Sequence, residues 1–220
     1  MITLLVMTDG RRDYLEQTLT SASQNLRGPI SVKLIHDDSG DPAYAAWLRE
    51  TYEPLGHVIH STGQRSGFGG AIRSAWSWLR ERDRNPLIFH LEDDFTFPAP
   101  IPTAGMTNIL NEPEIVQVSL MRQAWNGDEI RAGGVVAANP GAFTLEPSPI
   151  PHLRHRAYFT TNPSIYRREL ILTHDWPTGD QSEGRFALDV FANPATCAAV
   201  IGDGEPNCHH IGEQRSGNGY

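Results

Sequence analysis

The chain contains almost no lysine. Lys33 is the only lysine among 18 basic residues, and the formal net charge of the 220 residues is −8. This net negative charge argues against non-specific electrostatic binding of nucleic acid, although it does not exclude a local basic patch. The excess of arginine has two explanations, which are bidentate recognition of an anion and a coding bias toward arginine.

Cysteines and long apolar runs are also scarce. Cys197 and Cys208 are the only cysteines, and two thiols at this spacing form neither a disulfide scaffold nor a zinc motif. No apolar run approaches the roughly 18 residues of a membrane span. The first residues, MITLLVMTDG, lack the basic start and the cleavage site of a signal peptide. We therefore expect a cytoplasmic protein that has no membrane partner.

Two glycine-rich phosphate motifs are absent. No segment has the sequence G-x-x-x-x-G-K-[ST] of a P-loop. The segment TDGRRDY, which follows the first apolar run, has a single glycine where a dinucleotide fingerprint needs G-x-G-x-x-G. A nucleotide diphosphate would therefore be held by carboxylates and a metal ion rather than by a glycine loop.

Apolar runs alternate with helical periodicity through the first half of the chain. This alternation predicts an α/β fold with a doubly wound, mostly parallel sheet that is flanked by helices. Apolar runs typical of buried strands cover residues 2–7, 31–36, 57–61 and 86–91, and helical spacing of apolar residues covers 11–26, 42–52 and 69–82.

The second half is less regular, and no repeat or linker divides the chain. We expect a single domain over residues 1–220, with nucleotide-type chemistry in the first half at about 1–98, more variable chemistry at about 99–202 and a mobile, lid-like tail at 203–220. Strands are predicted at 115–120 and 197–202, helices at 167–174 and 182–192, and a Gly/Pro-rich connection at 133–151.

Acidic side chains follow three of the four predicted strands of the first half. Ligands bind at the carboxyl ends of the strands in open parallel sheets. Crowded carboxylates repel one another unless a partner offsets their charge, and Mg²⁺ or Mn²⁺ prefers oxygen ligands. A metal-diphosphate clamp is thus one interpretation, and a loop of ordinary solvated acids is the other. The residues are Asp9, then Asp37 and Asp38, and then Glu92, Asp93 and Asp94.

Four segments, LLVMTDGRRDYLEQTLTSA, IHDDSG, GFGGAIRSAW and FHLEDDF, resemble nucleotide-sugar glycosyltransferases of the GT-A fold, closest to the family 2 type. The last segment matches the D-x-D region of that family in an E-D-D form. The resemblance implies a GT-A fold with a nucleotide-sugar half at about 1–98 and an acceptor half at about 99–202. It also implies that Asp94 is a direct ligand of Mn²⁺ or Mg²⁺. It also implies that Glu92 and Asp93 lie near the ribose and the diphosphate.

The resemblance places further residues around the donor. Thr8, Asp9 and Asp38 would surround the base and ribose. Gly69 in GFGGA would let the backbone approach the nucleotide, although this segment could simply be a tight helix start. The other residues expected at the nucleotide sugar are Asp37, Arg11, Arg65, Arg73 and, in the tail, Arg215.

A catalytic base and a second metal ligand are expected in the last forty residues. Inverting enzymes of this fold carry a carboxylate base on a late helix, because the acceptor hydroxyl must lose its proton in the attack. Glu183 in SEGRFALDV is the first candidate and Asp189 the second, unless Glu183 only caps the helix. His210 in CHHIG would complete the metal site, as a late histidine does in related enzymes, or would be a surface histidine.

Three residues are expected on the acceptor side. Trp125 could stack on a sugar or a base, or it could be a core residue. Tyr158 and Asn162 lie in YFTTNPSIYRRELI, which resembles a segment near the donor sugar and acceptor, although Asn162-Pro163 could equally form a turn before a strand.

These expectations describe a metal-dependent hexosyltransferase that uses a nucleoside-diphosphate sugar, with UDP favoured. Inversion of the anomeric carbon is favoured, and retention stays open because the sequence does not fix the stereochemistry. The acceptor hydroxyl could belong to a protein, a glycan or a hydroxymethylated DNA base. The basic, aromatic segment PHLRHRAYF with Arg167 and Arg168 could follow a nucleic-acid backbone, hold the donor diphosphate or be a mixed surface. A DNA base would have to be flipped out of its duplex to be reached. Alternatives are a non-catalytic nucleotide-sugar binder and a nucleotidyltransferase, although MTDGRRDYL lacks the glycines of the latter's first loop.

Overall fold

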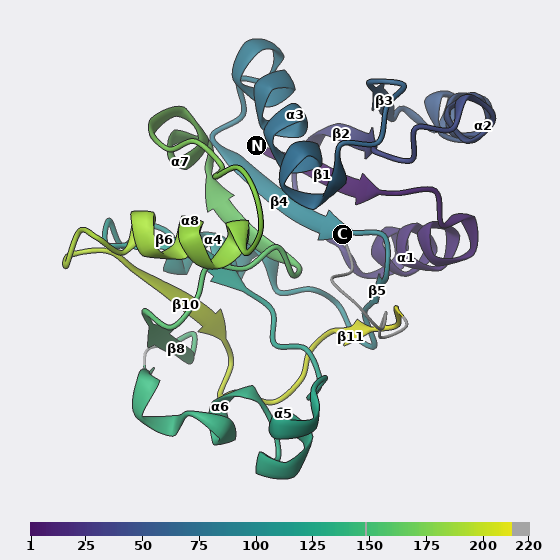
Figure 1. Ribbon diagram of the computed structural model, residues 1–220. Coiled ribbons are helices and arrows are strands. Elements are labelled where there is room, and N and C mark those ends of the chain that lie inside the picture. Colours follow the sequence, from purple (N-terminus) through teal and green to yellow (C-terminus); the bar gives the residue numbers. More distant parts are fainter. Residues whose placement is uncertain (148, 213–220) are drawn as a thin grey trace.

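A nine-stranded sheet runs through the computed structural model, which describes residues 1–147 and 149–212 (Figure 1). Its strand order is β3-β2-β1-β4-β9-β6-β10-β8-β7. Strands β8 and β9 run antiparallel to their neighbours, and the remaining strands point the same way. The sheet is therefore mostly parallel, as the sequence predicts.

The strands of this sheet are β1 (Ile2–Thr8), β2 (Ile30–Asp37), β3 (Val58–Ser61), β4 (Leu87–Glu92), β6 (Ile115–Ser119), β7 (Phe143–Glu146), β8 (His152–His155), β9 (Ser164–Arg167) and β10 (Cys197–Ile201). A separate pair is formed by β5 (Phe95–Thr96) and β11 (His209–His210). The helices are α1 (Arg12–Asn25), α2 (Pro42–Tyr52), α3 (Gly67–Arg82), α4 (Thr103–Ile109), α5 (Gly127–Ala132), α6 (Val135–Ala138), α7 (Arg168–Thr173) and α8 (Ser182–Val190), with short 3-10 turns η1 (Glu53–Leu55) and η2 (Pro140–Ala142).

Alternating side chains of β1 explain why helices cover both faces of the sheet. Leu4 and Val6 belong to a core that they share with α1, α2 and α4. Leu5 and Met7 point to the other face and belong to a core with α3, α7 and α8. Successive side chains of a strand point to opposite faces, so an uninterrupted apolar run fits a strand that is buried on both sides. The doubly wound α/β prediction is confirmed.

The second half departs from the prediction in several places, among them helices α4 and α5, which were not predicted. Residues 167–174 are not helical throughout, because Arg167 ends β9 and α7 begins one residue later. The Gly/Pro-rich stretch contains α6, η2 and β7, and the strand β8 was not predicted at all. Its sequence HLRH carries no apolar run, and it becomes a strand by pairing with β7 and β10. No helix in the described part of the chain has the length and apolar character needed to cross a bilayer.

Candidate active site

A cleft of about 1130 Å³ opens beyond the carboxyl ends of β4 and β6. The start of α3 forms one wall, the loop before α8 forms another, and residues 119–129 form a third. The cleft lies where a sheet of this topology binds its ligands. Of the residues expected from the sequence, the following line it: Arg11, Gly69, Arg73, Glu92, Asp94, Trp125, Tyr158, Asn162, Glu183 and His210.

The guanidinium group of Arg11 lies among three carboxylates at one end of this cleft. Its Nη1 donates to Asp94 Oδ2 at 2.8 Å, its Nη2 donates to Asp93 Oδ1, and its Nε is 2.9 Å from Asp9 Oδ1. Asp93 is only 1% exposed, and burial raises its pKa to about 7, although Arg11 acts in the opposite direction. The guanidinium group of Arg11 therefore offsets part of the repulsion among these carboxyl groups.

Asp94 and His210 form the part of this cluster that can hold a metal ion. Asp94 Oδ2 lies 3.2 Å from His210 Nε2, and Asp94 Oδ1 is buried without a hydrogen-bond partner among the described residues. Burial acts to raise the pKa of Asp94, but His210 and Arg11 outweigh it and hold the pKa below its usual value.

The donor set fits a hard divalent cation that is shared with a substrate. Within residues 1–147 and 149–212, no group of three or more His, Cys, Asp or Glu side chains is arranged to hold a metal ion. Mg²⁺ and similar ions often use one or two protein ligands and take the others from phosphates and water. Asp94 and His210, with one carboxylate oxygen unengaged, match that arrangement.

His210 reaches the cluster because the end of the described chain is built into the fold. Strand β11 pairs with β5, so that His210 lies opposite Phe95. The backbone of His210 exchanges two hydrogen bonds with the side chain of Gln123, at 2.9 and 2.7 Å. Cys208 is fully buried, and its N–H donates to Met121 O. The sequence predicts a mobile tail from residue 203, but the structure anchors residues 207–212. Arg215 lies outside the described residues.

Gly212 offers a sharp test of this packing. A Cβ atom at Gly212 would collide with the Asp94 carboxylate and would lie 3.2 Å from His210 Nε2. We expect Gly212→Ala to weaken Mn²⁺ binding by about 10–100-fold, which is the usual effect of disturbing the support of a metal site. Isothermal titration of Mn²⁺ in the presence of UDP measures this loss. Gly184→Ala is the matched control, because a Cβ at Gly184 meets nothing within 4 Å; equal affinities of the two variants would contradict the packing described.

Glu183 lines the cleft from the first turn of α8. Its Oε1 accepts hydrogen bonds from Thr161 N at 2.8 Å and from Thr161 Oγ1 at 3.2 Å. Burial raises the pKa of Glu183, and burial together with the charge of Asp94 raises the pKa of Glu92 well above its ordinary value. The carboxyl group of Glu183 is therefore fixed in place and more basic than a solvated one, which suits a proton acceptor.

The start of α8 is held by aromatic packing. Trp176 Nε1 donates to Ser182 Oγ at 3.0 Å, and its ring stacks on Phe186 at a centroid distance of 4.7 Å. Asp189, the second candidate base, lies on the other side of the same helix. It is exposed and outside the cleft, with Oδ2 2.9 Å from His174 Nδ1. The structure therefore brings Glu183 to the site and leaves Asp189 out of it.

Several residues expected at the nucleoside do not line this cleft. Thr8 Oγ1 donates to Asp93 Oδ2 at 2.7 Å, and Arg65 Nη2 is 2.9 Å from Asp9 Oδ2. Asp37 accepts from the backbone of the following turn. These side chains hold the acidic cluster and its loops in place, and none of them lines the cleft in the described structure.

Asp38 ties the end of β2 to the start of α3. Its Oδ1 accepts from Ser66 N at 2.9 Å and from Ser66 Oγ at 2.5 Å. Ser66 is the first residue before α3, whose initial glycines and Arg73 line the cleft. Asp38 therefore shapes this wall through Ser66.

An Arg122–Glu129 pair in the cleft was not foreseen. Arg122 Nη1 and Nη2 donate to the two oxygens of Glu129 at 2.7 and 3.0 Å, and Glu129 also accepts from Trp125 N at 2.8 Å. The loop that carries Trp125 is thus held by one carboxylate. The sequence gives little indication of this pair, because Arg122 reaches Glu129 only through the turn at Asn126 that caps α5.

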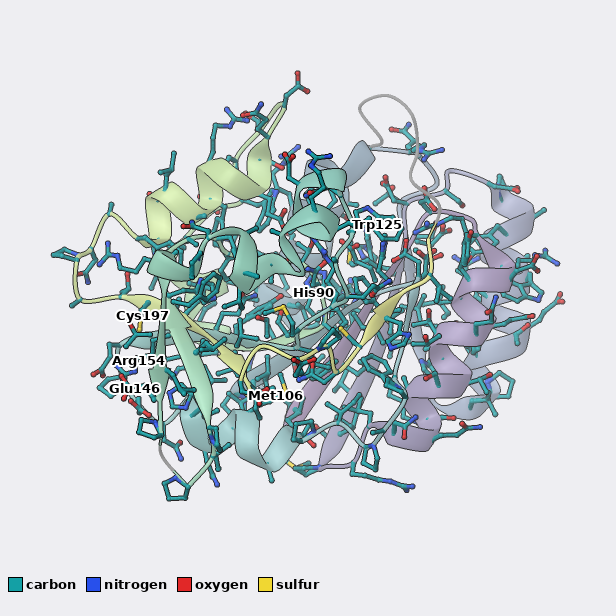
Figure 2. All side chains as sticks on the ribbon, turned by 90° about the horizontal axis from the view of Figure 1, so that it is seen from below. His90, Met106, Trp125, Glu146, Arg154 and Cys197 are labelled. Carbon is teal, nitrogen blue, oxygen red and sulfur yellow. The ribbon has the colours of Figure 1, made fainter. Side chains whose placement is uncertain are left out.

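The arginines of the predicted basic patch are largely used inside the fold. Arg156 and Arg167 donate to main-chain carbonyls, and Arg168 Nη2 donates to Arg80 O at 2.9 Å. Arg154 lies beside Glu146 at the β7–β8 edge, away from Trp125 (Figure 2). The patch is therefore not a row of unengaged guanidinium groups.

The chain matches no model of a known protein family and no curated protein. Solved structures do match. They include the mannosyltransferase PcManGT from Pyrobaculum calidifontis with GDP-Man and Mn²⁺ (17% identity, 97% of this chain, 57% of that chain, TM-score 0.64). They also include S. aureus TarS 1-349 with UDP-GlcNAc (15%, 99%, 60%, TM-score 0.66) and GalNAc-T7 with UDP, GalNAc and Mn²⁺ (10%, 96%, 44%, TM-score 0.67). The chain thus spans 44 to 60% of the length of these structures. Identities this low show the fold alone, and the GT-A fold prediction is confirmed.

Proposed function

We propose that this protein is a metal-dependent glycosyltransferase that moves a sugar from a nucleoside-diphosphate sugar to an acceptor hydroxyl. The observation that carries the proposal is that Asp94, His210 and Glu183 line one cleft of a GT-A fold. The three neighbours named above hold UDP, UDP-GlcNAc or GDP-Man, which supports a nucleotide-sugar donor with UDP favoured.

Asp94 and His210 would hold Mn²⁺ or Mg²⁺ on the donor diphosphate. A cation in that position stabilises the negative charge that develops on the leaving group. Across the cleft, α3 begins without a side-chain cap and carries glycines in its first turn. Unpaired amides at a helix start attract phosphate oxygens, and Arg73 on the second turn adds a positive charge.

Glu183 would take the proton of the acceptor hydroxyl as that oxygen attacks the anomeric carbon. Thr161 orients the carboxylate through two hydrogen bonds, so the base is in position before the acceptor arrives. A single base on one side of the donor supports a one-step transfer with inversion. Trp125, Tyr158 and Asn162 line the acceptor side of the same cleft.

A protein or glycan hydroxyl suits this cleft better than a DNA base does. Glu92, Asp94, Glu129, Asp180 and Glu183 line it against three arginines, Arg11, Arg73 and Arg122. Carboxylates in excess repel the phosphates of a nucleic acid. In the basic patch, Arg156, Arg167 and Arg168 donate to main-chain carbonyls, and Arg154 pairs with nearby glutamates.

The activity is tested by incubating the protein with Mn²⁺ and a panel of nucleotide sugars, with and without acceptors. Release of nucleoside diphosphate that rises with a hydroxyl acceptor supports transfer. Formation of pyrophosphate from a nucleoside triphosphate and a sugar phosphate would identify a nucleotidyltransferase instead. Binding of the nucleotide sugar with no product from any acceptor would identify a non-catalytic binder.

Asp38 provides a test of the nucleotide half. We expect Asp38→Ala to lower the free energy of unfolding by about 1.5–3 kcal/mol, because hydrogen bonds to a charged group are lost. UDP binding should weaken, because Ser66 no longer fixes the start of α3. Urea unfolding and calorimetric titration measure the two effects. Asp41→Ala is the control, since Asp41 caps α2 and does not line the cleft. A change in acceptor KM with normal UDP affinity would show that Asp38 acts elsewhere.

A further inference from the structure

The negative charge of the acidic cluster is already partly offset without a metal ion. Arg11 pairs with Asp9, Asp93 and Asp94, and Arg65 pairs with the second oxygen of Asp9. The cluster therefore holds three carboxylates and two guanidinium groups. The side chain of Arg11 is only 16% exposed, so this is a built-in contact and not a loose surface pair.

We infer that Arg11 occupies the cation position of the cluster in the free protein, so that a divalent metal ion binds well only together with a nucleoside diphosphate. This inference rests on the proposed function, because it concerns the order in which the metal ion and the donor enter the same site.

The contact to Asp94 is the reason for competition. Arg11 Nη1 donates to Asp94 Oδ2 at 2.8 Å, and the same oxygen lies 3.2 Å from His210 Nε2. A metal ion held by Asp94 and His210 would therefore share its carboxylate with a guanidinium group a few ångströms away. Two positive charges at this distance in a partly buried site repel each other. The repulsion weakens binding of the metal ion by at least about tenfold.

A diphosphate removes this conflict. Its negative charge offsets the divalent cation, and its oxygens are acceptors that match the planar fork of a guanidinium group. Arg11 lines the cleft and can donate to such oxygens from where it stands. Arg11 is therefore a positioning residue that holds the Asp94 carboxylate in the free protein and also donates to the diphosphate when the donor is bound.

A merely structural Arg11 makes a different prediction. In that case Arg11 only offsets the buried charge of Asp93, to which its Nη2 donates. Its removal would then lower stability without strengthening Mn²⁺ binding. The affinity for Mn²⁺ in the absence of nucleotide separates the two roles, and it does not depend on turnover.

The test is a titration of Mn²⁺ followed by electron paramagnetic resonance, with and without UDP, on the wild type, Arg11→Met and Arg12→Met. In the wild type, UDP should tighten Mn²⁺ binding at least about tenfold. In Arg11→Met, Mn²⁺ alone should bind at least about tenfold more tightly than to the wild type, and the effect of UDP should shrink. Arg12 is the matched control, because its guanidinium group stacks on Trp47 and does not line the cleft.

Arg11→Gln keeps a hydrogen-bond donor for Asp93 but removes the positive charge. It replaces Arg11→Met if that variant folds poorly, and its affinity for Mn²⁺ alone should rise by the same factor. Unchanged or weaker binding of Mn²⁺ alone to folded Arg11 variants would overturn the inference while leaving the proposed function intact. Equal binding of Mn²⁺ to the wild type with and without UDP would also overturn the inference and leave the proposed function intact. A wild type that binds neither Mn²⁺ nor Mn²⁺ with UDP would contradict the proposed function as well.

Discussion

Replacement of Asp94 by asparagine is expected to slow sugar transfer by at least about a thousandfold. A metal ion contributes several kcal/mol of charge stabilisation at a leaving phosphate, and each 1.4 kcal/mol or so is a factor of ten in rate. Asparagine fills the same space but loses the charge that draws both the cation and His210. The rate of nucleoside diphosphate release at saturating acceptor measures the loss, and Mn²⁺-dependent binding of UDP should fall with it.

The fold should survive this substitution, because Asp94 is at the cleft and contributes no apolar packing. Asp128→Asn is the matched control, since Asp128 is an exposed carboxylate paired with Arg131. It should retain normal activity. A chelator should reproduce the Asp94 result in the wild type. Full activity in the chelator, or in Asp94→Asn, would remove the metal ion from the mechanism.

Replacement of Glu183 by glutamine is expected to lower kcat by about 10²–10⁴-fold, which is the range for loss of a general base. Glutamine can still accept hydrogen bonds from Thr161, so donor affinity should change little. Asp189→Asn is the matched control on the same helix, because Asp189 is exposed and pairs with His174 outside the cleft. Equal loss of activity in both variants would indicate damage to α8 rather than loss of a base.

The pH dependence gives a second readout for Glu183. Burial raises its pKa above the ordinary value of a glutamate, which is about 4.3. A base works in its deprotonated form, so kcat should fall as pH decreases through that raised pKa. The acid limb of the profile should therefore lie at a higher pH than an ordinary carboxylate would give. It should disappear in the residual activity of Glu183→Gln, and an unchanged limb would assign it to another group.

Local sequence patterns predicted the first half of the fold well. Strands β1 and β4 are apolar runs, and α3 has apolar residues at helical spacing, so their own sequences specify them. The acidic residues that follow these strands then meet at one edge, because parallel strands bring their carboxyl ends together. The cluster around Asp94 could be anticipated for this reason.

Contacts between distant segments could not be predicted in the same way. Strand β8 forms only because β7 and β10 supply its partners. Strand β11 joins β5 across more than a hundred residues, and nothing in the sequence HH indicates a strand. The position of His210 came from family resemblance alone. The Arg122–Glu129 pair depends on a turn whose geometry the residues between them do not specify uniquely.

The most direct test of the metal site is anomalous diffraction from crystals of the protein soaked with Mn²⁺ and UDP. The proposal predicts one strong manganese peak within coordination distance of Asp94 Oδ1 or Oδ2 and of His210 Nε2, with the UDP diphosphate on its open side. A manganese peak elsewhere, or clear density for UDP in the cleft with no manganese beside Asp94, would contradict it.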